Sequence, residues 1–323
     1  MNAPEPPVQP LTSTPPPEPL AEPLTSTPPP EPLAERLTST LLPEPFGGRR
    51  RTGGRRSPTL VIGCLLAGAI VAVAVVSLFW LPFPPDDTSG GRLAPPGPPH
   101  LLGTDKLGRD LLTQLMIGAR IALTAGIGSV ALGGVLGVAA GLPAGFATRW
   151  LDDTIAALLD ILIAFPTLLL AMLLVAAREA SLGSAVLAIG LAMSAIVARL
   201  TRVLVKRVLA QDFITASRTS GTSWPRVVAE HVLPNIWPTL LVNLALQLGL
   251  AVLAEASLSY LGLGAPPPNA SWGRMLQEAQ STVLTAPLGA VAPGLLLIML
   301  VVGVNLVADG LRDVADPTRR RSR

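Results

Sequence analysis

Apolar residues gather into six long runs, and short segments rich in charges, glycine or proline separate them. The runs lie at residues 59–81, 117–146, 153–177, 182–204, 235–257 and 287–308. The hydrocarbon core of a membrane is about 30 Å thick, and a helix rises about 1.5 Å per residue, so roughly 20 apolar residues suffice to cross it. The pattern therefore predicts an all-α polytopic membrane protein with six transmembrane helices.

The composition supports this prediction and excludes several functions. Half of the 323 residues are apolar and only 14% are charged, which argues against a soluble enzyme. The single cysteine, Cys64, lies in the first apolar run, so no intrachain disulfide can form. The two histidines, His100 and His231, are far apart and have no acidic cluster beside them, so we expect no metal site.

The first 58 residues have a different character from the rest of the chain. The sequence PLTSTPPPEPLAE at 10–22 recurs at 23–35, and a degraded third copy begins at Arg36. Its prolines disfavour helices and sheets, and it has few bulky apolar residues to bury, so we expect a disordered tail. The tail is interpreted as a spacer, or alternatively as a ligand for a proline-binding domain.

Basic residues between the runs are distributed unequally. Counting alternate segments as opposite sides of the membrane places eighteen Lys and Arg on one side and six on the other. The positive-inside rule then predicts that both termini are cytoplasmic. The predicted organisation is a Pro-rich cytoplasmic tail with a basic knot (1–58), a first transmembrane helix (59–81), an extracytoplasmic segment (82–115), a core of further spans (116–312) containing a cytoplasmic loop (205–233), and a basic cytoplasmic tail (313–323).

Nucleotide hydrolysis is not expected in this chain. A P-loop requires a lysine followed by Ser or Thr, whereas Lys106 precedes Leu107 and Lys206 precedes Arg207. Any ATP and magnesium that act on this chain must therefore bind a partner protein that contacts it from the cytoplasm. The 205–233 loop is the natural contact.

Residues within this loop have properties suited to docking. Asp212 to Ser220 is long enough for a short helix, and Gly221 is expected to end it with a positive φ. The small side chains of Ala216 and Ser217 would let one face of this helix enter a groove on a partner. The Arg218 guanidinium would offer paired N–H donors to a partner carboxylate. Prolines 225, 234 and 238 would direct the chain back into the fifth span. The alternative is a basic loop held at anionic lipid headgroups.

This loop resembles the segment by which permease subunits of ABC importers dock onto their ATPases. The family signature is Glu-Ala-Ala, three residues, then Gly, and finally a hydrophobic-Leu-Pro segment; Thr215 stands in place of the Glu and Ser217 in place of the second Ala. The resemblance implies a coupling role for six residues: Thr215, Ala216, Ser217, Arg218, Gly221 and Pro234. Because the carboxylate is missing, the family's salt bridge from that position is not expected here.

Two further motifs narrow the resemblance to the C-type permease subunit of bacterial dipeptide and oligopeptide importers. The first is HLLGTDKLGRD at 100–110 with Gly118-Ala119-Arg120, and the second is YLGLG at 260–264 with SWGRML at 271–276. The predicted extracytoplasmic motif comprises Gly103, Thr104, Asp105, Gly108, Arg109, Asp110 and Trp272.

The physical roles expected in this motif are structural. Asp110 would cap the next helix, the two glycines would permit tight turns, and Arg109 would pair with Asp105 or Asp110. Trp272 is interpreted as an interfacial anchor or as part of an outer lid that contacts a solute-binding protein.

Polar residues inside apolar runs need a partner or a purpose. They are Asp160, Arg199, Asn243, Gln247, Glu255, Asn305 and Asp309. We expect Asp160 and Arg199 to form a buried structural pair. Asn243 and Gln247 are four residues apart and therefore share a helix face, which would line a translocation path or join two helices. Pro166 and Pro293 are expected to kink their helices.

The resemblance implies the type I ABC importer permease fold in a bacterial cytoplasmic membrane. Implied partners are a homologous second permease, two ATP-binding subunits, an extracytoplasmic solute-binding protein, a peptide substrate and the lipid bilayer; no nucleic acid is expected. The chain itself would be a transport subunit rather than an enzyme. An importer for nickel chelates or another small solute remains open, as does a membrane scaffold or receptor without transport activity.

Overall fold

The computed structural model describes residues 58–266 and 269–315. The predicted repeat tail and the C-terminal basic tail lie outside these residues. The regular secondary structure of the described residues is helical, apart from one isolated β-bridge between Thr104 and Asp110. The α-helices are α2 (Pro58–Phe79), α3 (Leu111–Ala144), α4 (Arg149–Ala164), α5 (Thr167–Ala176), α6 (Leu182–Leu209), α7 (Asp212–Thr219), α8 (Trp224–Val227), α9 (Leu233–Tyr260), α10 (Trp272–Ala279) and α11 (Leu288–Ala315), with a π-helical turn at Val228–Val232 between α8 and α9.

Five of the described helical stretches are long and apolar enough to cross a membrane, or six if a bent pair counts as one span. The bent pair is α4 with α5, whose axes differ by 82°. The predicted run 153–177 is therefore not one continuous helix. Pro166 lacks a backbone N–H and disfavours helical geometry in Phe165, so the kink predicted at Pro166 is a complete break.

Several helices extend beyond their apolar runs, and α3 and α6 show why. α3 begins at Leu111, six residues before the predicted run, because the Asp110 carboxylate accepts a hydrogen bond from the Thr113 N–H at 2.8 Å and caps the helix there. α6 continues to Leu209, five residues past its run. Its last turn carries Lys206 and Arg207, which suit the carbonyl end of a helix dipole. Hydropathy thus marked the apolar stretch but not the helix ends.

The helices pack closely where glycines face a neighbour. Gly133 and Gly137, one turn apart on α3, lie against α6. A Cβ added to Gly137 would come within 2.5 Å of the Val197 Cβ, and one added to Gly133 within 2.8 Å of the Gly190 carbonyl oxygen. Small residues thus let the backbones of α3 and α6 approach each other closely.

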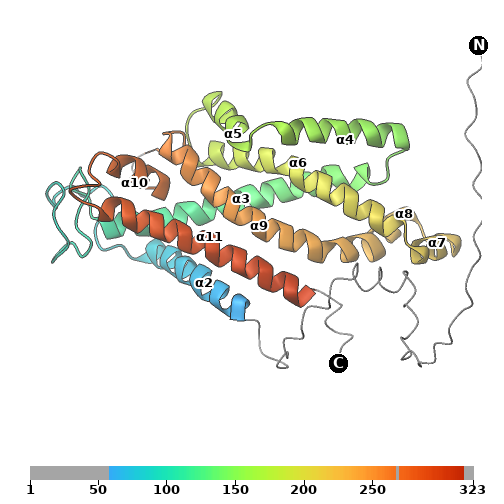
Figure 1. The fold of residues 1–323 in the computed structure, drawn as a ribbon, viewed down its shortest axis with the longest axis horizontal. Helices are drawn as coiled ribbons and strands as arrows, with labels where there is room; N and C mark the ends of the chain where they lie inside the picture. The colour runs from blue at the N-terminus through green and yellow to red at the C-terminus, as the bar shows by residue number, and fades with distance from the viewer. Residues whose placement is uncertain (1–57, 267–268, 316–323) are drawn as a thin grey trace, which may run out of the picture. The chain divides into compact units, whose positions relative to one another are not determined.

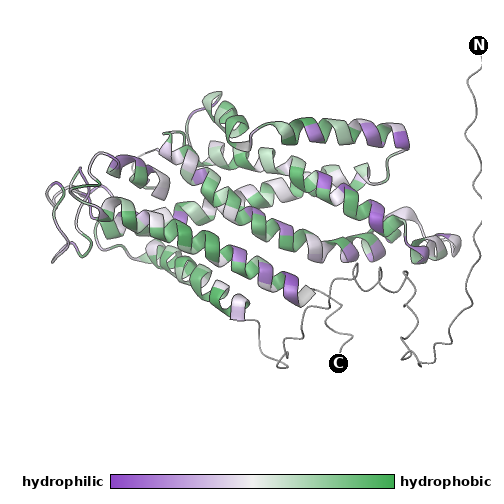
Figure 2. Cartoon of the chain, in the orientation of Figure 1, coloured by the Kyte–Doolittle hydropathy of each residue, from purple (hydrophilic) through white to green (hydrophobic). Residues whose placement is uncertain are grey.

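The two ends of the bundle differ in their irregular structure (Figure 1). Residues 80–110, which we call the cap segment, lie with α10 at one end, the cap end. α7 and α8 lie at the opposite end, the loop end. Hydrophobic residues predominate along α2, α5 and the middle of α11, whereas hydrophilic residues of α4 and α6 gather toward the loop end (Figure 2).

Candidate functional site

The predicted coupling loop, residues 205–233, contains the expected short helix. α7 spans Asp212–Thr219, and Gly221 follows with a φ of +88°. The Gly221 N–H donates to the Arg218 carbonyl at 3.0 Å, and the Thr222 N–H donates to the Ser217 carbonyl at 3.2 Å. Glycine adopts this left-handed conformation without the steric penalty of a Cβ, so its predicted role in ending the helix is confirmed.

One face of α7 is anchored in the protein and the other is open. Ile214 is 3% exposed and packs in an apolar cluster with Val205 and Val227. The next two residues, Thr215 and Ala216, are exposed. The loop end thus holds a short amphipathic helix by its apolar side and leaves its other face exposed.

Arg218 is held inside the predicted coupling loop. Its guanidinium lies 4.3 Å from the ring centroid of Trp224 and donates to the Thr222 carbonyl. The Trp224 ring in turn meets Phe146 edge-on, with centroids 5.4 Å apart. These contacts connect α7 with α8 and with the residues that follow α3 through packed aromatic groups.

Two other predicted coupling residues also lie at this end. The Ser217 hydroxyl is 3.2 Å from Nε2 of His231, and the His231 ring also meets Phe213 edge-on with centroids 6.0 Å apart. Pro234 is exposed at the start of α9, directly after the π-helical turn.

A charged cluster ties α4 to α6 near the loop end. The Asp152 carboxylate accepts a hydrogen bond from Nε of Arg202 at 2.6 Å and also pairs with the Lys206 ammonium. The Asp152 and Arg202 side chains are 11% and 13% exposed. Both partners of the carboxylate come from α6, so the cluster fixes where α4 begins.

The cap segment folds around the predicted extracytoplasmic motif. Gly103 and Gly108 have φ values of +82° and +87°, which confirms the predicted turns. The Thr104 hydroxyl donates to the Gly91 carbonyl at 2.7 Å and accepts from the Ala94 N–H at 2.8 Å. These bonds join distant parts of the cap segment into a compact structure.

Arg109 links the cap segment to α10. Its Nε lies 2.6 Å from the Asp105 carboxylate, which confirms the predicted pairing, and its Nη2 lies 2.8 Å from Glu278. Glu278 also accepts from Nε of Arg274 at 2.9 Å. The side chains of Arg109, Asp105 and Glu278 are 13% to 14% exposed, so this network lies largely inside the protein.

Trp272 is a core residue and not an interfacial anchor. It is 1% exposed, and its indole N–H donates to the Leu115 carbonyl at 3.0 Å. Its ring lies where the side chain of residue 118 would be if that residue were not glycine. Because Gly118 on α3 has no side chain, the Trp272 ring can pack against the α3 backbone. A tryptophan anchored at the membrane surface would not be enclosed in this way.

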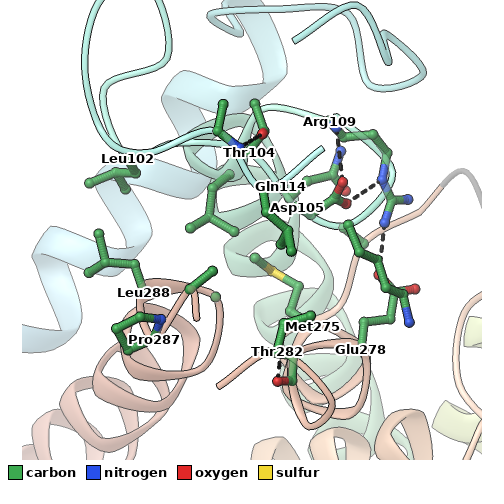
Figure 3. A pocket seen from close by; sticks show the side chains of 18 of the residues that line it. Leu102, Thr104, Asp105, Arg109, Gln114, Met275, Glu278, Thr282, Pro287 and Leu288 are labelled. Atoms are coloured by element: carbon green, nitrogen blue, oxygen red, sulfur yellow. Dashed lines mark hydrogen bonds and ion pairs between the residues drawn. The ribbon is translucent and has the colours of Figure 1, made fainter. Parts of the chain in front are cut away.

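A cavity of about 240 Å³ lies under the cap segment (Figure 3). Its walls include Leu102, Asp105, Gln114, Met275, Glu278 and Leu288. The Gln114 amide nitrogen donates to the Pro85 carbonyl, while its oxygen has no partner among the described residues. Ligand pockets usually exceed about 300 Å³, so the space suits a side chain or waters better than a whole peptide.

The polar residues of the spans occupy different environments. The predicted Asp160–Arg199 pair forms at 2.9 Å, but each side chain is 54% exposed in this chain, so the prediction of burial is wrong. Gln247 is 4% exposed, whereas Asn243 lines a hollow of about 370 Å³ between α6, α9 and α11. Glu255 is 1% exposed and accepts a hydrogen bond from the Ser259 hydroxyl at 2.6 Å.

Sequence reasoning missed three residues that organise these sites: Asp152, Trp224 and Glu278. Glu278 follows Arg274 by four residues, a spacing that indicates a helical ion pair. Trp224 precedes Pro225 at the start of a helix, which marks a helix N-terminus. Neither signal identifies the contact that lies far away in the sequence, which is Arg109 for Glu278 and Phe146 for Trp224.

In the described part of the chain, no group of three or more His, Cys, Asp or Glu side chains is arranged to hold a metal ion.

At least five long apolar helices define a multi-pass membrane protein. Residues 133–321 match the family described as binding-protein-dependent transport system inner membrane component. Because this match covers more than half of the chain, the protein belongs to that family of transport permeases.

Several relatives extend the similarity beyond the matched domain. The dipeptide transport system permease protein DppC of Alkalihalophilus pseudofirmus is 34% identical over 81% of this chain and 87% of the relative. The di/tripeptide transport system permease protein DppC of Pseudomonas aeruginosa is 40% identical over 72% and 76%. The glutathione transport system permease protein GsiD of Pectobacterium atrosepticum is 36% identical over 78% and 85%.

A solved structure supports the fold. A chain of the MetNI methionine ABC transporter, in an inward-facing conformation, matches with a TM-score of 0.53 over 63% of this chain and 97% of that chain, at 20% identity. The chain therefore has the type I ABC importer permease fold.

Proposed function

We propose that this permease forms half of a translocation path and that its α7 docks onto an ATP-binding subunit. The observation that carries the proposal is the exposed face of α7, held from behind by Ile214. A surface that is exposed yet rigidly supported can bind a partner at low entropic cost. The docking residues would be Thr215, Ala216, Ser217, Arg218, Gly221 and Pro234.

The proposed orientation places the loop end in the cytoplasm. The predicted coupling loop and the last turns of α6 carry a cluster of five basic residues, as the positive-inside rule expects of a cytoplasmic segment: Arg202, Lys206, Arg207, Arg218 and Arg226. Both termini are then cytoplasmic, and the cap end faces outward, in a bacterial cytoplasmic membrane. A solute-binding protein would meet the cap end, and a homologous permease would complete the path.

The proposed cargo is a short peptide. Relatives of similar identity are named for dipeptides, di/tripeptides and glutathione, which are all peptides or peptide-like. Transport would need no covalent step in this chain. ATP binding would close the ATPase pair, and the force would pass from α7 through Arg218, Trp224 and Phe146 to the bundle.

A coupling measurement tests the proposal. The complex of this chain with its second permease, ATP-binding subunits and binding protein would be reconstituted in liposomes. Gly221→Val forces a β-branched residue into a φ of +88°, which deforms the exit from α7. We expect membrane insertion to persist and peptide uptake per ATP hydrolysed to fall at least tenfold.

Gly262 provides a matched control. Its φ is +81° and, as at Gly221, a Cβ added to it would meet open space, but it follows α9 near the cap end. Gly262→Val therefore imposes a similar backbone strain and should leave coupling nearly unchanged. Normal coupling in Gly221→Val, or equal losses in both variants, would reject docking through α7.

A further inference from the structure

The Asp160–Arg199 ion pair is exposed in a part of the molecule where charges are expensive. Asp160 lies on α4 eight residues beyond Asp152, which corresponds to about 12 Å along the helix. Around it, Leu158, Ile161 and Phe165 are also exposed, each by 58%. The pair therefore sits within an apolar surface rather than at the polar start of α4.

The neighbouring cluster shows what a structural pair looks like between the same helices. Asp152 and Arg202 are 11% and 13% exposed, and a second cation, Lys206, completes their interactions. Asp160 and Arg199 pair with each other at 2.9 Å and are each 54% exposed. Half of the surface of each charged side chain therefore needs water or another polar group.

Lipid cannot meet that need. Charged side chains within membrane spans usually face the bundle interior or a water-filled cavity and mark the routes of polar solutes. An arginine can extend its long stem toward the membrane surface, but the short stem of an aspartate cannot. The exposed face of Asp160 and Arg199 is therefore better suited to an aqueous path than to the bilayer.

We infer that Asp160 and Arg199 form a substrate-contacting site in the translocation path and that its ligand is a zwitterion, such as a free dipeptide. The inference rests on the proposed transport of peptides. The Arg199 guanidinium offers two parallel N–H donors to the terminal carboxylate, and the Asp160 carboxylate accepts from the terminal ammonium. In the empty path the two side chains neutralise each other, so neither leaves an unpaired charge.

Cysteine labelling tests whether the site faces water. Cys64, the only cysteine, is first replaced with serine. Ala164→Cys then places a thiol one turn from Asp160 on the exposed side of α4 and leaves the ion pair intact. A membrane-impermeant cationic thiosulfonate should label it in the reconstituted complex, and a transported free dipeptide should slow the labelling at least threefold.

Leu65→Cys is the control for a lipid-facing position. Leu65 is 68% exposed on α2, which packs against α3 and α11. It should remain unlabelled under the same conditions. Failure of Ala164→Cys to react, or reaction at a rate that dipeptide does not change, would overturn the inference.

Uptake kinetics test the zwitterion. Arg199→Gln and Asp160→Asn should each raise the KM for a free dipeptide about tenfold without changing the ATPase rate in the absence of peptide. Arg207→Gln and Asp153→Asn, exposed residues on the same two helices, should leave KM unchanged. A double exchange, Asp160→Arg with Arg199→Asp, restores an ion pair and should still show the raised KM.

The outcomes separate this inference from the proposed function. Full rescue by the double exchange, or an unchanged KM in both single variants, would mean that the pair is only structural, while peptide uptake by the unaltered complex would still support the proposed function. Absence of peptide uptake by the unaltered complex would reject the proposed function itself.

Discussion

The cap end and the loop end use similar residues in opposite ways. At the cap end, Trp272 is 1% exposed and Arg109 is 14% exposed, each bound to a partner from a distant part of the chain. At the loop end, Trp224 is 46% exposed and Arg226 is 68% exposed, with contacts mostly to near neighbours. These aromatic and charged side chains are thus buried within the chain at the cap end, whereas those at the loop end are left partly exposed, as the proposed docking requires.

The largest expected effect is a loss of stability at the cap end. A Cβ at residue 273 would overlap the Ala256 carbonyl, a backbone group that cannot turn away. Gly273→Val should therefore lower the free energy of unfolding by about 3 kcal/mol. Thermal unfolding of the purified protein in lipid nanodiscs measures this change.

Gly68→Ala is the matched control for that substitution. A Cβ at residue 68 of α2 meets nothing within 4 Å, and alanine favours helix more than glycine does. It should leave stability unchanged or raise it slightly. A Gly273→Val variant as stable as Gly68→Ala would show that α10 does not pack on α9 as described.

Ion pairs at the two ends should differ in how much they contribute to the free energy of unfolding. Arg109→Leu leaves Asp105 and Glu278 without their shared cation in a largely buried network, and we expect a loss of about 2 kcal/mol. Arg226→Leu breaks an exposed pair with Glu230 and should cost about 0.5 kcal/mol or less. Chemical unfolding of both variants gives the comparison, and equal losses would contradict the distinction between the two ends.

Trp224 should matter more for coupling than for stability. Trp224→Ala removes the ring that lies beneath Arg218 and against Phe146, at a cost of about 1 kcal/mol. We expect uptake per ATP to fall severalfold in the reconstituted complex. Trp237→Ala, at a residue 50% exposed on α9, is the control and should retain coupling. Equal coupling in the two variants would argue against transmission through Trp224.

The smallest expected effect concerns Thr215. Its side chain is exposed, so Thr215→Glu should change the free energy of unfolding by less than about 0.5 kcal/mol. The new carboxylate occupies the position that holds Glu in the family signature, and we expect it to tighten ATPase binding modestly. Titration of the permease pair with its ATPase measures the affinity. A weaker complex would indicate that this position faces acidic groups.

The spans were predictable because each follows from a local property, the length of an apolar run. The ends of α3 and α6 were less predictable, since capping by Asp110 and a basic last turn extend a helix beyond the apolar residues. The break between α4 and α5 was signalled by Pro166, but its 82° bend depends on how α5 packs against α6.

In the candidate sites, too, local features were predictable from the sequence and contacts between distant residues were not. Turns at Gly103, Gly108 and Gly221 were predictable from glycine itself. The burial of Trp272 was not, because its space is made by Gly118, more than 150 residues earlier in the chain. The pairing of Asp160 with Arg199 was predicted from their opposite charges within apolar runs, but their exposure depends on what else covers that face of the protein.

Site-specific cross-linking at α7 tests the central claim most directly. In a Cys64→Ser background, Ala216→Cys places one thiol on the exposed face of α7, and Leu284→Cys places one at the opposite end, where Leu284 is 96% exposed. We predict that a short thiol cross-linker joins residue 216, and not residue 284, to the ATP-binding subunit, with a yield that changes when ATP binds. Cross-linking of the ATPase at residue 284 alone, or at neither residue in an actively transporting complex, would contradict the account.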